Sequence, residues 1–254
     1  MKNSKVFFTN HYINQIVTQF FAKANSINLE SLNNHKYSDD ITFISYGILR
    51  GTGQIFSKSN NFIYIDHGYI NSSKRKFTSD KRTILKSLDG YFRVVKNDLY
   101  FNRNFNNQDN TRFNELDIKL KNLNKNGKKI ILSEPSDNTL NFLKIPHWTK
   151  ETIEEIKKYS DREIIVHNKF SKISLSEALK DAYAFVCCQS TAAFQAIIEG
   201  VPSYFTHNSL KHFGEIKNIE DRKLNHSLLY TATNSQWKLT EFFSNDFKNF
   251  LDNI

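Results

Sequence analysis

The stretch FVCCQSTAAFQAIIEGVPSYF, from Phe185 to Phe205, decides the fold class. Its first four residues are apolar, as in a strand that is covered on both faces of its sheet. A Ser-Thr pair then begins a helix, Gly200 ends it, and a second apolar strand follows. The stretch is therefore a strand–helix–strand unit, which is the building block of a parallel sheet.

The same alternation of short apolar strands and amphipathic helices runs along most of the chain. Strands are predicted at residues 5–9, 41–46, 61–66, 91–95, 128–133, 163–166, 183–187 and 203–206. Helices are predicted at residues 11–23, 48–56, 78–88, 113–123, 149–159, 174–182, 191–199 and 241–251, with Thr149, Ser174 and Thr240 as N-caps. This order predicts an α/β fold with parallel sheets.

Residues 97–126 are rich in asparagine and weakly patterned, so they are the best candidate for a domain boundary. The chain of 254 residues is long enough for two small domains. The prediction is therefore two Rossmann-like halves with parallel sheets. The N-terminal half takes residues 1–125, and the C-terminal half takes residues 126–254 with a closing helix.

The amino-acid composition limits the classes of binding partner and the cellular location that we expect. The formal net charge of +9 draws the protein toward phosphates on nucleic acid, on an anionic membrane or on a small molecule, although a solvated lysine surface explains it equally well. Adjacent Cys187 and Cys188 suit neither a disulfide nor a metal site and fit a reducing, cytoplasmic setting. No apolar run reaches the roughly 18 residues that span a bilayer, and no signal core opens the chain.

The sequence lacks the motifs of several large enzyme classes. Its histidines are scattered, with neither a His-x-x-x-His pair nor a Cys-x-x-Cys pair. A glycine-rich dinucleotide loop, a Walker lysine loop and a Gly-x-Ser-x-Gly elbow are missing as well. We therefore expect neither a bound metal nor a cofactor.

Gln189, Ser190 and Thr191 stand where a buried strand turns into a helix. Backbone N–H groups, hydroxyls and the helix dipole make such a turn an anion site, and ligands of open α/β sheets bind at this edge. Glu199 comes two helical turns later, directly before Gly200. The alternative is an ordinary turn with a serine cap.

In the N-terminal half, Asp66 ends a strand directly before the turn at His67-Gly68. A catalytic carboxylate would face the cleft from this position, and an Asp-x-Gly turn residue is the alternative. Arg93 lies in the next predicted strand and could bind a carboxylate or a phosphate.

Two further polar groups follow strands of the C-terminal half. His167-Asn168-Lys169 forms a small basic cluster after one strand, with a chance surface loop as its alternative. Glu134 and Asp137 follow the first strand of this half and lie at the crevice end of the sheet. A helix or turn cap is the favoured alternative for these two carboxylates.

Together these segments resemble GT-B glycosyltransferases, above all the bacterial capsule and lipopolysaccharide transferases that use CMP-Kdo, their sialyltransferase-like relatives and phage-encoded relatives. The resemblance is clear over residues 128–206, moderate over 41–97 and thin elsewhere. It implies a metal-independent enzyme with a nucleotide sugar as its co-substrate. The segment 222–243 resembles the closing part of these proteins, which supplies a crossing helix in many GT-B folds.

In this family the Ser/Thr turn holds the nucleotide phosphate, the helix glutamate faces the ribose, and a basic cluster neutralises the donor phosphates. The family's His-Pro reads His167-Asn168 here, which leaves open whether His167 or Lys169 does this work. The implied donor-binding residues are Arg93, His167, Lys169, Gln189, Ser190, Thr191 and Glu199.

The resemblance also assigns catalytic carboxylates. Asp66 would act as the general base or position the acceptor. In some retaining Kdo transferases a second carboxylate is the nucleophile of a double displacement, and Glu134 or Asp137 could take that part.

The expected activity is sugar transfer from a nucleotide donor, with CMP-Kdo favoured, to a glycan or a lipid-linked glycan. Such an enzyme would work in the cytoplasm, with peripheral contact to the inner membrane as an option. One alternative is a phage enzyme that glycosylates modified DNA bases, which the positive charge would suit. The other is a nucleotide- or sugar-binding module without catalysis.

Overall fold

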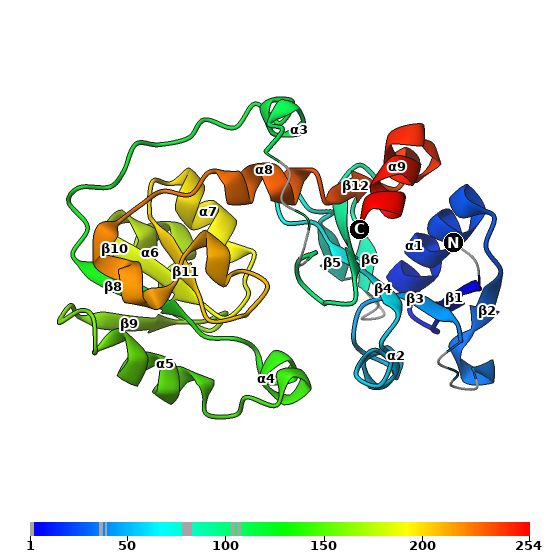
Figure 1. The fold of residues 1–254 in the computed structure, drawn as a ribbon, viewed down its shortest axis with the longest axis horizontal. Helices are drawn as coiled ribbons and strands as arrows, with labels where there is room; N and C mark the ends of the chain where they lie inside the picture. The colour runs from blue at the N-terminus through cyan, green and yellow to red at the C-terminus, as the bar shows by residue number, and fades with distance from the viewer. Residues whose placement is uncertain (1–2, 36–37, 39, 78–82, 103–104, 106–107) are drawn as a thin grey trace. The chain divides into compact units, whose positions relative to one another are not determined.

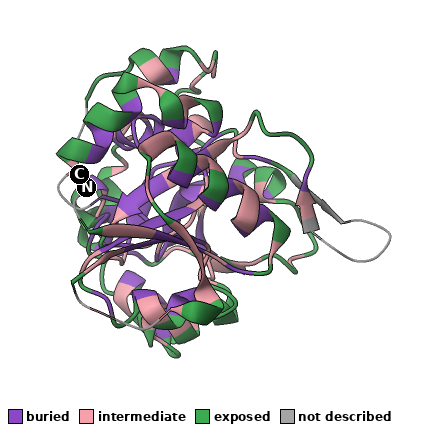
Figure 2. Ribbon diagram, turned by 90° about the vertical axis from the view of Figure 1, so that its right-hand side faces the viewer, coloured by how far each residue is buried: buried purple, intermediate pink, exposed green. Residues whose placement is uncertain are grey.

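The computed structural model of the chain describes residues 3–35, 38, 40–77, 83–102, 105 and 108–254. Two compact units make up the fold: unit 1 comprises Met1–Phe105 and Ala232–Ile254, and unit 2 comprises Asn106–Thr231. Each unit contains a sheet with helices packed on it (Figure 1), so the predicted α/β class is confirmed. Buried residues concentrate on the strands, while the helices keep exposed outer faces (Figure 2).

Unit 1 has a six-stranded sheet in the order β12-β7-β4-β3-β1-β2. The strands are β1 (Ser4–Phe8), β2 (Leu29–Ser31), β3 (Thr42–Tyr46), β4 (Phe62–His67), β7 (Tyr91–Lys96) and β12 (Gln236–Lys238). The four strands from β2 to β4 run parallel, whereas β7 is antiparallel to β4 and β12 is antiparallel to β7. The predicted parallel sheet thus carries two antiparallel strands at one edge.

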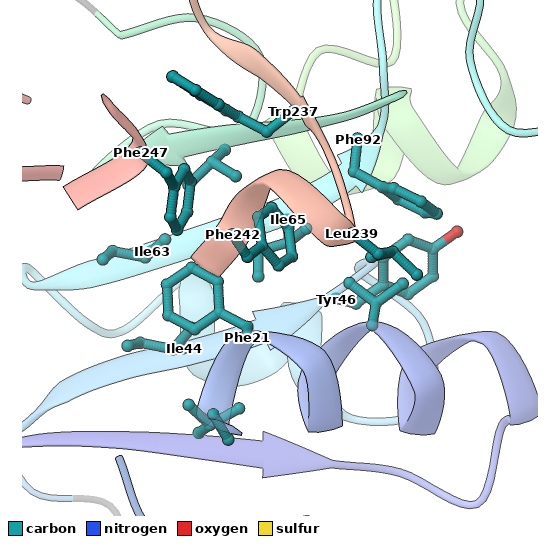
Figure 3. Close-up of a cluster of buried hydrophobic side chains, with 14 of the residues drawn as sticks. Phe21, Ile44, Tyr46, Ile63, Ile65, Phe92, Trp237, Leu239, Phe242 and Phe247 are labelled. Atoms are coloured by element: carbon teal, nitrogen blue, oxygen red, sulfur yellow. The ribbon is translucent and has the colours of Figure 1, made fainter. Parts of the chain in front are cut away.

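Helices and 3-10 turns surround this sheet. They are α1 (Tyr12–Asn25), α2 (Thr52–Phe56), α9 (Asn245–Asn253) and the 3-10 turns η1 (Leu32–Asn34) and η4 (Thr240–Phe243). Figure 3 shows the core between α1, η4 and the sheet, where the rings of Phe21 and Phe242 lie 5.6 Å apart. The predicted closing helix is thus split, and Ser244, not Thr240, caps α9 by accepting from the Phe247 N–H at 3.1 Å.

A hairpin of β5 (Arg75–Phe77) and β6 (Thr83–Leu85) replaces part of the helix predicted at residues 78–88. Residues 78–82 of that prediction lie outside the described residues. The prediction is wrong at Thr83–Leu85, because these residues pair with β5 and Leu85 packs into the same core as α1. Burial of an apolar side chain here overrides helical propensity.

Unit 2 has a four-stranded, fully parallel sheet in the order β11-β10-β8-β9. Its strands are β8 (Lys129–Ser133), β9 (Ile164–His167), β10 (Ala182–Cys187) and β11 (Ser203–Phe205). Its helices are α3 (Thr111–Asn114), α4 (Asp137–Leu143), α5 (Trp148–Ile156), α6 (Leu175–Lys180), α7 (Ala192–Ile198), and the 3-10 segments η2 (Lys211–Phe213) and η3 (Ile216–Asp221). Helix α8 (Ser227–Thr233) contains the second boundary between the units.

The two units share one strand order. Numbered along the chain within each unit, both parallel segments read 2-1-3-4: β2-β1-β3-β4 in unit 1 and β9-β8-β10-β11 in unit 2. The direction of winding therefore reverses between β1 and β3, and again between β8 and β10. Ligands of open α/β sheets bind at the carboxyl ends of the strands at such a switch point.

The unit boundaries differ from the predicted division at residue 125. Residues 106–126 belong to unit 2, where the N–H groups of Lys121 and Asn124 donate to the carbonyls of Ile198 and Gly200, each at 2.9 Å. These bonds hold the segment extended, so the predicted helix at 113–123 is wrong beyond α3. Residues 232–254 return to unit 1, because β12 extends its sheet and α9 packs on its core.

Two helix starts in unit 2 test the predicted caps. Ser174 caps α6 as predicted, since its hydroxyl accepts from the Glu177 N–H at 3.2 Å. Thr149 does not cap α5, which begins one residue earlier at Trp148. Its hydroxyl instead donates to Glu134 at 2.9 Å, so a residue predicted to start a helix lies at the crevice edge of the sheet.

Candidate functional site

A cavity of about 300 Å³ lies at the switch point of unit 1. It is lined by Thr9 after β1, His11 and Asn14 at the start of α1, Tyr46 at the end of β3, the loop of residues 47–50, and Asp66 near the end of β4. A cavity with several polar groups at the carboxyl ends of parallel strands is the expected place for a ligand or an active site.

Asn14 holds the two central strands of this site together. Its side-chain oxygen accepts from the Thr9 N–H at 2.8 Å, and its amide group donates to the Tyr46 carbonyl at 2.7 Å. Ser45 completes the link by donating from its hydroxyl to the Phe7 carbonyl at 2.7 Å. Because these groups are buried and fully bonded, they fix the shape of the switch point.

Asp66 is surrounded by hydrogen-bond donors. Its carboxylate accepts from the Tyr64 hydroxyl at 2.5 Å, from the His67 N–H at 2.8 Å and from the Arg93 guanidinium at 3.1 Å. Burial alone would raise the pKa of Asp66, but Arg93, His67 and Tyr64 outweigh it and hold that pKa below its ordinary value. The carboxylate is therefore ionised at neutral pH.

Arg93 lies behind Asp66 in a cage of tyrosines. It also donates to the His67 carbonyl at 3.0 Å, and its guanidinium carbon is 5.3–5.8 Å from the ring centres of Tyr64, Tyr69 and Tyr100. Burial opposes its charge, yet Asp66 and the phenols raise the pKa of Arg93 above its ordinary value. Only 11% of its side chain is exposed, so Arg93 is placed to hold Asp66 rather than to contact a ligand directly.

His67 links the β4 end to β3. Its Nε2 lies 3.0 Å from the Tyr46 hydroxyl, and its ring stacks on Phe92 with centres 6.0 Å apart. The turn predicted at Asp66-His67-Gly68 is therefore a place where three neighbouring strands are bonded to one another.

In unit 2, Glu134 joins the ends of β8 and β9. One carboxylate oxygen accepts from the Thr149 hydroxyl at 2.9 Å and the other from the Asn168 amide at 3.0 Å, while its N–H donates to the His167 carbonyl at 3.0 Å. Two predicted segments, Glu134 and His167-Asn168-Lys169, are thus brought together at the crevice edge of the sheet.

The side chains of His167 and Lys169, the two basic residues of this cluster, lie in different environments. The His167 ring lies with Nε2 3.1 Å from the Ile173 carbonyl, within its own loop. The Lys169 ammonium is exposed and lies 4.8 Å from the ring centre of Phe170. Lys169 is therefore the better placed of the two to meet a phosphate in solution.

Gln189, Ser190 and Thr191 follow β10 at the switch point of unit 2. The Ser190 hydroxyl accepts from the Ala192 N–H at 3.2 Å, and the Ser190 N–H donates to the Cys187 thiol. The side-chain oxygen of Gln189 is buried, with no hydrogen-bond partner among the described residues. Ser190 therefore closes a short turn before α7, whereas Thr191, the residue directly before the helix, makes no side-chain capping bond.

Glu199 does not join this group. It follows the last residue of α7 and forms an ion pair with Lys121, whereas Ser190 and Thr191 come before the first residue of that helix. At 1.5 Å of rise per residue, the helix itself is roughly 10 Å long and separates the two groups by at least that distance. The predicted donor set therefore divides into residues at the start of α7 and a glutamate at its end.

Asp137 is the first residue of α4 and is exposed. The preceding Ser136 caps this helix by accepting from the Thr139 N–H at 3.4 Å. A carboxylate in the first turn stabilises the positive end of a helix, so the capping alternative describes Asp137 well. Of the two predicted carboxylates after β8, only Glu134 lies against another predicted site segment.

Cys187 and Cys188 are buried and unbonded to each other. Burial raises the pKa of both thiols, that of Cys188 to about 11, so they are not activated nucleophiles. In the described part of the chain, no three His, Cys, Asp or Glu side chains come together in a group able to hold a metal ion. The described helices are also too short or too polar to cross a bilayer.

The sequence does not predict His11, Asn14 or the loop of residues 47–50 as site residues, although all of them line the cavity. The sequence did contain a signal for His11. This residue lies between a strand and the helix that follows it, and Ser190 has the same kind of position in unit 2. Only the strand order shows that β1 and β3 flank the switch point.

Comparison with models of known protein families gives no match to this chain. No curated protein matches it either.

Proposed function

We propose that this protein is a glycosyltransferase that moves a sugar from a nucleotide donor to a hydroxyl group. The observation that carries the proposal is the cavity at the switch point of unit 1, which is lined by both polar and apolar side chains, in a unit whose parallel strands have the same order as those of unit 2. By analogy at the level of the fold, two Rossmann-like units fit an enzyme that binds a donor and an acceptor separately. The return of residues 232–254 to unit 1 is a further point of likeness to GT-B folds.

Unit 2 would bind the nucleotide. Its crevice edge carries Lys169, the Ser190-Thr191 turn and the Glu134–Asn168 pair, which offer a cation, hydroxyls and hydrogen-bond partners for phosphate and ribose. Stabilisation of the leaving phosphate by such groups needs no metal. We favour CMP-Kdo or another acidic sugar as the donor on the resemblance of residues 128–206 alone.

Unit 1 would bind the acceptor at the cavity beside Asp66. A glycan or a lipid-linked glycan is the favoured acceptor, and a lipid-linked one would bring the protein to the cytoplasmic face of a membrane. The ionised Asp66 would orient the acceptor hydroxyl as a hydrogen-bond acceptor.

Nucleotide binding tests the first half of this proposal. Each unit contains one of the two tryptophans, Trp148 in unit 2 and Trp237 in unit 1. In a Trp237→Phe variant, fluorescence reports the unfolding of unit 2, and a nucleotide at 100 times its Kd should stabilise that unit by about 2.7 kcal/mol. CMP, UDP, CMP-Kdo and UDP-glucose are the ligands to compare. If none of them shifts the transition, unit 2 is not a nucleotide site.

The net charge of +9 favours DNA as a second acceptor class. Binding that rests on phosphate contacts weakens steeply with salt, with a slope near −0.9 per contact on a log–log plot. Duplex binding with such a slope would favour a base-modifying transferase, whereas absent binding at low salt would favour a glycan acceptor.

A further inference from the structure

A second cavity of unit 1 lies at the opposite end of β1 from the candidate site. Its volume is about 490 Å³, and it is lined by residues 3–4, 24–28, 248 and 251–252. These residues belong to the start of β1, the turn after α1 and the C-terminal half of α9. Because the five residues of β1 rise by roughly 3.3 Å each, about 15 Å of strand separates the two cavities. The second cavity is therefore distinct from the candidate site.

Backbone hydrogen bonds fix the walls of the second cavity. The turn after α1 is closed by Ile27, whose N–H donates to the Ala22 carbonyl at 3.0 Å. Asn28 joins this turn to β1, since its carbonyl accepts from the Val6 N–H at 3.0 Å. On α9, Leu251 packs into the same hydrophobic core as Val6. The cavity is therefore preformed, which lowers the ordering cost of binding a ligand.

The hydroxyl of Ser4 is a polar group of this cavity that the described protein leaves unsatisfied. It is buried and has no hydrogen-bond partner among the described residues. Ser4 lies on the same face of β1 as Val6, because side chains alternate along a strand, and Val6 belongs to the core beside α1. A buried hydroxyl without a partner costs free energy, and a ligand that bonds to it removes that cost.

The charges of the lining favour an uncharged ligand. Among the described residues of the lining, Lys248 is the one cation and Asp252 the one anion, and at four residues apart they share a face of α9. A phosphate near Lys248 would also meet the negative charge of Asp252, and an amine or a metal ion near Asp252 would meet Lys248. An ionic ligand therefore gains little net attraction here.

The other side chains of the lining match the surface of a sugar. The amides of Asn3, Asn25 and Asn28 can both donate and accept hydrogen bonds, as sugar hydroxyls do. Ile27 and Leu251 add apolar side chains, against which the C–H groups of a sugar ring can pack. A neutral ligand that presents hydroxyls and C–H groups together is a carbohydrate.

We propose that the second cavity binds a neutral oligosaccharide and holds the acceptor glycan away from the point of transfer. The role in acceptor binding rests on the proposed glycosyltransferase function, whereas the binding itself does not. The acceptor is then a chain of several sugars, because a single sugar cannot reach both cavities across the length of β1.

Titration of the full chain with oligosaccharides tests the binding. Wild-type protein is offered maltohexaose, cellohexaose, laminarihexaose and chitohexaose, with hexasialic acid as a charged probe, and calorimetry gives each affinity. At least one neutral hexasaccharide should bind, and hexasialic acid should bind more weakly. In a Trp148→Phe background, the bound hexasaccharide should raise the unfolding midpoint that Trp237 reports for unit 1.

Ser4→Ala distinguishes a ligand-binding hydroxyl from a structural one. It should lower the affinity for that hexasaccharide about fivefold, the effect of one hydrogen bond. The free protein should keep its stability or gain some, because the hydroxyl has no described partner to lose. Asn28→Ala should lower the affinity to a similar extent. Asn249→Ala is the matched control, since Asn249 is exposed on α9 outside the lining and should leave binding unchanged.

The proposal is overturned if none of the neutral hexasaccharides binds, if hexasialic acid binds best, or if Ser4→Ala and Asn28→Ala both keep the wild-type affinity. Nucleotide release from sugar donors tests the transferase separately. A protein that binds the hexasaccharide in this cavity but releases no nucleotide keeps the binding site and loses its role in transfer.

Discussion

At the scale of single residues, the Asp66–Arg93 pair determines the properties of the candidate site. Burial makes each charge depend on the other, because an isolated buried charge costs several kcal/mol. The side chains of Asp66 and Arg93 are 25% and 11% exposed, and three tyrosine rings surround the guanidinium. The pair therefore contributes both to stability and to the charge of the cavity.

Replacing one partner separates these two contributions. Asp66→Asn should destabilise unit 1 by about 3 kcal/mol, since it leaves Arg93 buried without a counter-ion. Asp66→Asn with Arg93→Met should recover part of that loss, but nucleotide release should stay more than about tenfold below the wild type. Denaturant unfolding followed at Trp237 gives the stability. Full activity in the double variant would show that the Asp66 charge is not needed.

The same pair predicts how stability changes with acid. The folded pKa of Asp66 lies below its ordinary value of 3.8, so the pair contributes its full stabilisation above about pH 4. That contribution is lost as the pH falls through the folded pKa. Unfolding free energies measured from pH 6 down to pH 2 should fall less steeply for the Asp66→Asn, Arg93→Met variant than for the wild type. Parallel curves would contradict this assignment.

At the scale of helices and strands, most strands follow from their apolar runs. Strands β1, β3, β4 and β7–β11 lie within a residue or two of their predicted ranges, because continuous apolar runs have few other places to be buried. The short β2, the β5–β6 hairpin and the short β12 escaped prediction, since each depends on pairing with another segment of the chain. A local pattern of three residues carries too little information to show such pairing.

The turn after α7 gives a test at this scale. Gly200 has φ +81°, and a Cβ there would lie 2.0 Å from the Asn122 carbonyl oxygen. Gly47 also has a positive φ, +73°, but a Cβ there meets nothing within 4 Å. Gly47→Ala should therefore cost only the left-handed strain of about 1–2 kcal/mol, and Gly200→Ala should cost clearly more. Equal losses in thermal unfolding would contradict the close approach of residues 121–124 to this turn.

At the scale of the whole molecule, the presence of two α/β units was predictable, but the assignment of chain segments to each unit was not. The alternation of strands and helices indicated both units, whereas the return of residues 232–254 to unit 1 depends on β12 pairing with β7. Likewise, some residues of the candidate sites could be predicted from the sequence and others could not. Asp66 and Glu134 could be picked out because each follows an apolar strand, but His11 required the strand order and Glu199 required the helix length.

Residues 232–254 should stabilise unit 1 and leave the stability of unit 2 unchanged. Phe242 is fully buried between α1 and the sheet, so Phe242→Ala should destabilise unit 1 by about 3–5 kcal/mol. In a Trp148→Phe background, Trp237 should report this loss, and in a Trp237→Phe background, Trp148 should report little change. The neighbouring Phe243 is 45% exposed, so Phe243→Ala is the matched control. A loss reported equally by both tryptophans would contradict the division into units.

Nucleotide release by Asp66→Asn, compared with wild-type protein on the same donor, tests the central claim most directly. We predict that wild-type protein releases the nucleotide from at least one nucleotide sugar. Asp66→Asn should release it more than about tenfold more slowly, while the nucleotide stabilises unit 2 equally in both proteins. A protein that binds nucleotides in unit 2 but releases none from any sugar donor would contradict the account and would instead be a binding module.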